Sequence, residues 1–124
     1  MTDRELLEQA AKAAGYSVEW VERRIARIGA FKQLQHERRD GFVMAGKEWN
    51  PLTDDGDALR LAVKLHMEID HNHPADQQPW VSVRAAPSHM YSVDEFEDES
   101  GRMAATRRAI TRAAAEIGKA QSKK

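Results

Sequence analysis

The sequence predicts an α+β protein in which about three helices cover a small antiparallel sheet, as a two- or three-layer sandwich. Amphipathic helical patterns stand near the start, in the middle and at the end of the chain, over 3–14, 54–66 and 102–119. Between them lie short apolar runs typical of strands, most clearly over 80–85. The order of helix, irregular strands, helix, hairpin and helix is typical of an α+β layer.

Length and composition bound the class of protein. With 124 residues, of which 41% are hydrophobic, we expect one domain over 1–120 and a frayed tail at 121–124. The absence of cysteine excludes a disulfide scaffold, a thiolate metal site and a cysteine nucleophile, and it fits a reducing cytoplasm. No apolar run approaches the roughly 18 residues of a membrane span, and the first residues do not resemble a signal peptide. The net charge of −1 argues against general binding to polyanions, so we expect neither a membrane nor a nucleic acid as partner.

The first helix has recognisable signals at both ends. Thr2 is a suitable N-cap, Glu5 completes a capping box, and Gly15 is suited to a left-handed stop. The predicted inward stripe comprises Leu6, Ala10, Ala13 and Ala14.

Residues 16–49 give weaker signals. We favour a short strand near 16–21, while Val21, Ile25 and Ile28 at helical spacing leave a short helix as an alternative. A second strand is predicted over 41–46, between two glycines.

The second helix follows a turn at Pro51. Thr53 is the expected N-cap, and acidic residues fill the first turn, where the helix dipole favours them. That role explains Asp54, Asp55 and Asp57 better than a calcium loop does. The predicted inward face comprises Leu59, Ala62, Val63 and His66.

A polar connection over 71–79 leads to the last three elements. The strand 80–85 should turn at Pro87–Ser88 and pair with 90–93. The helix over 102–119 has a predicted inward stripe of Met103, Thr106, Ile110, Ala113, Ala114 and Ile117. We expect about 1.5–3 kcal/mol from burying each large apolar side chain of the three helices.

Charge is distributed in blocks along the chain. Residues 94–100 carry a charge of −5, and 101–124 carry +6. An acidic run ahead of a basic helix suits the helix dipole. An acidic loop that binds a basic partner is the alternative.

Three segments carry a family resemblance: Glu5–Tyr16, Trp49–Leu65 with its Trp-Asn-Pro-Leu-Thr-Asp turn, and Ala104–Ala114. They resemble the first helix, the middle turn and helix, and the last helix of small phage and prophage proteins that are similar to phage ABA-sandwich domains. The resemblance implies a phage origin and a small α/β fold, and it supplies no catalytic residues. We therefore expect a non-enzymatic, cofactor-free binding protein in the bacterial cytoplasm that modulates a host or anti-phage defence protein.

The region 20–48 lies outside the resemblance and is the expected partner-binding surface. Its candidate residues are aromatic and basic, the types enriched in binding hot spots. They are Trp20, Arg23, Arg24, Arg27, Phe31, Arg38 and Arg39.

Two other groups of residues allow different functions. Arg107, Arg108 and Arg112 could hold an anionic, nucleotide-like ligand, or they could form a solvated face paired with the acidic run. His71 and His73, with His66 or Asp70, could ligate a metal in an enzyme, but their spacing matches no zinc motif and we favour a solvated loop. No nucleophile elbow or phosphate-binding loop occurs in the sequence.

Overall fold

The computed structural model describes residues 1–85 and 90–122, with the side chains of residues 27, 30, 90 and 122 left aside. Its helices are α1 (Asp3–Ala14), α2 (Asp55–Lys64) and α3 (Arg102–Ser122), with single turns η1 (Ala30–Lys32) and η2 (Glu99–Gly101). The strands are β1 (Glu19–Val21), β2 (Arg24–Ile28), β3 (Leu34–Arg38), β4 (Gly41–Met44), β5 (Lys47–Trp49), β6 (Met67–His71), β7 (Trp80–Ala85) and β8 (Met90–Glu95). They form three small antiparallel sheets, so the predicted α+β class is confirmed.

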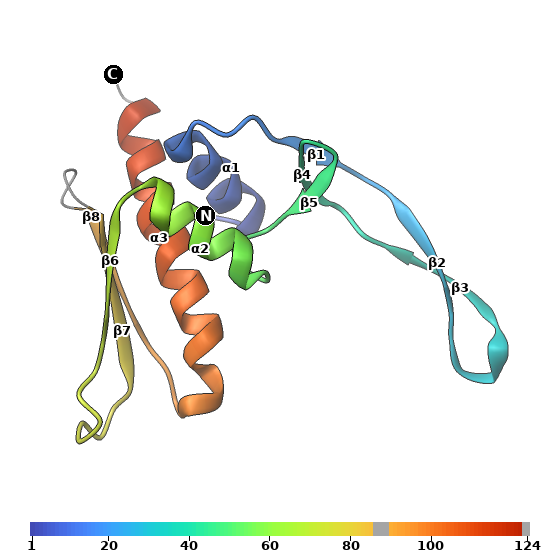
Figure 1. The fold of residues 1–124 in the computed structure, drawn as a ribbon. Helices are drawn as coiled ribbons and strands as arrows, with labels where there is room; N and C mark the ends of the chain where they lie inside the picture. Colours follow the sequence, from blue (N-terminus) through green and yellow to red (C-terminus); the bar gives the residue numbers. More distant parts are fainter. Residues whose placement is uncertain (86–89, 123–124) are drawn as a thin grey trace.

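The sheet β6–β7–β8 forms one layer of the body, and α3 packs on one of its faces (Figure 1). Val81 and Val83 of β7 are fully buried on that face because side chains alternate along a strand. The predicted pairing of 80–85 with the segment from residue 90 is confirmed, and β8 continues to Glu95. Pro87–Ser88, where we expected the turn, lies outside the described residues. The strand β6 was not anticipated from the sequence.

The predicted bounds and caps of α1 are confirmed. The Thr2 side chain accepts from the Glu5 N–H, and Gly15 adopts a φ of 73°. The buried side chains are Leu7, Ala10, Ala11 and Ala14, so the stripe is centred one residue beyond the predicted Leu6. This face packs on α3 rather than directly on the sheet, and the contact is close enough that Gly118 lies against the Gln9 backbone. The layer order is therefore sheet, α3, α1.

The predicted inward face of α2 is wrong at its large residues. Leu59 and Val63 are exposed, whereas Ala62 is buried as predicted, together with Ala58 and Leu61. The reason is a polar anchor beside them: the buried carboxylate of Asp57 faces the body, where it accepts the backbone N–H of Asn50 at 2.9 Å.

The helix α2 also begins differently from the prediction. Asp54, rather than Thr53, is its N-cap and accepts the Asp57 N–H at 2.8 Å. His66, predicted to face inward, lies beyond the helix at a φ of 52° and is exposed.

The helix α3 is longer than predicted, because residues 121 and 122 continue it where a frayed tail was expected. Met103, expected to face inward, is exposed, whereas Ile110, Ala113 and Ala114 are buried as predicted.

Residues 16–49 form strands throughout most of their length, and the alternative helix through Val21, Ile25 and Ile28 is wrong. β1 and β4 pair through Trp20 and Phe42, whose rings meet edge to face with centroids 5.0 Å apart. The small sheet β1–β4–β5 joins the body to the hairpin β2–β3, which projects far from the helices (Figure 1).

Candidate functional site

The projecting hairpin is the most distinctive surface of the molecule, and we call residues 22–40 the arm. It carries six basic and three acidic side chains, so it is basic within a chain of net charge −1. All five residues of β3 are exposed. The arm therefore contributes little to a hydrophobic core and exposes most of its described side chains to solvent.

Three apolar side chains gather at the tip of the arm. Phe31 is 95% exposed, and Ile28 and Leu34, which face each other across the last strand pair, are 75% and 65% exposed. Phe31 has a φ of 64°, in the left-handed region that is costly for a bulky residue. Such a strained and exposed aromatic ring does not stabilise the fold.

One face of the arm changes from apolar at the tip to basic at the stem. The register places Arg24 opposite Arg38, His36 opposite Ala26, and Ile28 opposite Leu34. Because directly opposed like charges destabilise a strand pair, the Arg24–Arg38 pairing does not serve hairpin stability.

Ion pairs hold the stem of the arm against the small sheet. Arg23 pairs with Glu48, and Arg39 approaches the same carboxylate at 3.5 Å. Asp40 accepts from the Arg23 N–H at 3.3 Å and from Arg38 Nε at 2.7 Å. These contacts fix the direction in which the arm leaves the body.

The structure therefore divides the predicted partner-binding residues into two groups. Phe31 and Arg24 are exposed on the arm itself, while Arg23, Arg38 and Arg39 hold its stem. Trp20 lies at the base, half-buried under the Arg4 guanidinium at 4.3 Å. The side chain of Arg27 is outside the described part of the structure. Sequence reasoning missed Ile28 and Leu34, although two five-residue runs around a glycine-containing loop are a hairpin signal.

The three arginines predicted to bind an anion do not form one cluster. Arg107 turns towards the start of α2, where it donates to the Leu52 carbonyl at 2.9 Å and pairs with Asp55 at 2.6 Å. Arg108 and Arg112 instead share Asp94 of β8, at 2.6 and 3.6 Å. Arg108 and Asp94 Oδ2 form an ion pair, but the two groups are not aligned for a hydrogen bond.

Arg108 and Arg112 line a groove of about 570 Å³ between α1, α3 and β8. Asp94 already compensates both guanidinium groups, and Glu116 of the same groove lies 3.7 Å from Lys119. The acidic run thus pairs with the basic helix, as one of the two sequence interpretations expected. An anionic ligand would have to displace these carboxylates.

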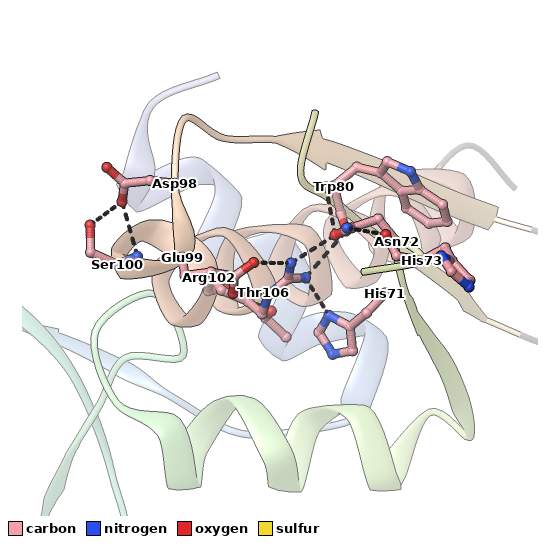
Figure 2. A network of polar contacts seen from close by, with 9 residues as sticks. All are labelled: His71, Asn72, His73, Trp80, Asp98, Glu99, Ser100, Arg102 and Thr106. Carbon is pink, nitrogen blue, oxygen red and sulfur yellow. Dashed lines mark hydrogen bonds and ion pairs between the residues drawn. The ribbon is translucent and has the colours of Figure 1, made fainter. Parts of the chain in front are cut away.

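The two histidines of the polar connection contact different groups. His71 Nδ1 is 2.9 Å from Arg102 Nη1 (Figure 2). His73 Nδ1 instead accepts the Ala75 N–H at 3.0 Å. His66, at the end of α2, joins neither. Within residues 1–85 and 90–122, no group of three or more His, Asp or Glu side chains is arranged to hold a metal ion.

Arg102 is the centre of the polar network around His71, a role that was not predicted from the sequence. Its guanidinium donates to Glu99 at 2.7 and 2.8 Å and to Asn72 Oδ1 at 2.7 Å (Figure 2). It also stacks over the Phe96 ring at 4.7 Å. The hydrogen bond from Arg102 lowers the pKa of Glu99. Since its donors are engaged by the protein, Arg102 joins the start of α3 to the sheet and is not poised for chemistry.

Comparisons with known proteins add no further constraint: no family model, curated protein or solved structure matches this chain. No helix among the described residues is both long and apolar enough to cross a membrane.

Proposed function

We propose that this chain is a small non-enzymatic binding protein that docks onto a partner protein through the tip of its arm. The resemblance of its helical segments to phage and prophage proteins extends the proposal. The protein would then be phage-encoded and would act in the bacterial cytoplasm on a host or anti-phage defence protein.

The exposure of Phe31 is the observation that carries this proposal. A ring 95% exposed at a strained φ of 64° lowers stability and solubility without contributing to a core. Its insertion into a partner's pocket would bury it at the centre of an interface, where aromatic residues contribute most to binding energy.

The chemistry around the tip indicates the kind of partner. Ile28 and Leu34 extend the apolar surface, the exposed Lys32 lies next to Phe31, and the exposed Arg24 lies on the same face towards the stem. An apolar pocket with an acidic rim on a protein complements this arrangement, because its charges would also steer the encounter. A nucleic acid offers phosphates rather than an apolar pocket, and several arm arginines are already paired with carboxylates.

A capture experiment with matched variants tests the proposal. Phe31→Asp removes the apolar tip, whereas Leu59→Asp changes another exposed apolar residue, on α2 and remote from the arm. Immobilised wild-type chain and the Leu59 variant should retain the same stoichiometric protein from bacterial lysate, and the Phe31 variant should not. The retained protein should then bind the purified chain in calorimetry, with affinity at least about tenfold weaker for Phe31→Asp.

Equal retention by all three proteins, or none by any, would remove the arm from the proposal. Circular dichroism must show the same helix content for each variant, so that a lost interaction is not a lost fold.

A further inference from the structure

We propose that the open face of the sheet β6–β7–β8 is a docking surface for the arm tip of a second copy of this chain. The inference rests on the proposed role of the arm as a binding element, and it adds a second surface and names its occupant.

The sheet has a covered face and an open face. Against α3 it buries Val81 and Val83, while Tyr91 and Val93 on the opposite face are 64% and 47% exposed. Among the described elements, the helices lie on one side of this sheet only (Figure 1). An antiparallel sheet tolerates a solvated face when that face is polar, but here aromatic and aliphatic side chains stand on it.

A hollow of about 360 Å³ lies on the open face. The register explains its shape: Ser82 lies opposite Val93 in the middle, Trp80 opposite Glu95 at one end, and Arg84 opposite Tyr91 at the other. Ser82 is small, whereas Trp80 and Tyr91 are large. The two aromatic side chains therefore form the ends of a shallow apolar hollow. This shape suits a protruding apolar knob such as Phe31 with Ile28 and Leu34.

The charges around the hollow complement the arm. Glu68 and Asp70 of β6 are exposed on the same face, opposite Arg84 and Ser82, and Glu95 closes one end. Three carboxylates against one guanidinium make this face acidic, whereas the arm is basic. Docking would place Arg24 and Lys32 near carboxylates and the apolar tip between Trp80 and Tyr91.

The docked arm must come from another molecule. The arm and this sheet lie on opposite sides of the helices, so an arm cannot reach the sheet of its own chain (Figure 1). The contact joins two different surfaces, so it gives a dimer with exchanged arms if a two-fold rotation closes it, and a larger ring or an open chain otherwise.

Sedimentation velocity of the full chain from micromolar to millimolar concentration tests this association. The wild-type chain should form assemblies that weaken with added salt, because charged rims are screened. Phe31→Asp on the arm and Val93→Arg on the sheet should each raise the dissociation constant at least about tenfold. Leu59→Asp, on neither surface, should leave it unchanged.

Mixing the two defective variants gives the sharper result. Phe31→Asp retains an intact sheet face, and Val93→Arg retains an intact arm. If an arm docks on a sheet face, the mixture should form a one-to-one pair although neither variant associates alone.

A wild-type chain that stays monomeric, an association that either variant leaves intact, or a mixture without pairs would overturn the inference. The proposed function fails separately. A monomeric chain that still captures a foreign protein through Phe31 refutes only self-association. A chain that associates through Phe31 and captures no other protein refutes only the foreign partner.

Discussion

The paired helices α1 and α3 and the arm use their small and large residues in opposite ways. Where the helices meet, alanines and Gly118 let two backbones approach, and these residues are almost completely buried. In the arm, the large apolar residues Ile28, Phe31 and Leu34 are largely exposed. A two-stranded ribbon is at best marginally stable alone, so the arm depends on its stem and contributes little to the body. We infer that the body determines stability and the arm determines binding, and substitutions should separate the two.

The largest expected effect is at the contact between α1 and α3. In Gly118→Val, the first added carbon would lie 2.0 Å from the backbone oxygen of Gln9, which cannot yield without moving a helix. We expect a loss of roughly 3 kcal/mol or more in the free energy of unfolding, measured by urea denaturation. Ala120→Val on the exposed face of the same helix is the control and should cost about 0.5 kcal/mol. Similar losses in both variants would mean that α1 does not pack on Gly118.

The next effect distinguishes the two faces of α2. Leu61→Ala empties a fully buried site and should cost about 2–5 kcal/mol. Leu59→Ala, at a position 61% exposed, should change stability by less than about 0.5 kcal/mol. The same denaturation measurement compares them, and a greater loss in the Leu59 variant would restore the face expected from the sequence.

A smaller effect is expected at the tip of the arm, where glycine should be more stabilising than alanine at position 31. Because Phe31 has a positive φ, the free energy of opening the tip should be about 1 kcal/mol higher in Phe31→Gly than in Phe31→Ala. At ordinary backbone angles alanine is the more stabilising of the two residues. Hydrogen exchange of the Gly29 amide, which donates to the Gln33 carbonyl at 3.0 Å, reports this local opening. Faster exchange in the glycine variant would contradict the left-handed conformation, and the stability of the body should not change in either.

The smallest effect is a pH dependence in the body that the arm should not share. The pKa of Glu99 is lowered by its hydrogen bond with Arg102, so its contribution to stability is complete above the unfolded pKa. That contribution is lost as the pH falls through the folded value. An NMR titration should place the Glu99 pKa below its ordinary value, and Arg102→Gln should raise it. An unchanged pKa in that variant would exclude the hydrogen bond as the cause.

Features that depend on neighbours along the chain were predictable from the sequence. The capping box of α1, its glycine stop, the acidic first turn of α2 and the strand β7 all follow from local hydrogen bonding and side-chain alternation. One of the two interpretations of the acidic run, its pairing with the basic helix, is also confirmed. Asp94 pairs with Arg108, and Glu99 pairs with Arg102, the first residue of α3.

The choice of buried apolar face, and the pairing of most charges, depended on how the elements pack together. On α2, two faces carry leucine, and the carboxylate of Asp57, bound to the Asn50 backbone in the preceding turn, selects the face with Leu61. Arg107 and Arg108 are adjacent in sequence but point to different carboxylates, because consecutive helical residues lie about 100° apart. The arm's exposure likewise depends on how β1, β4 and β5 direct it away from the helices, which no local pattern specifies.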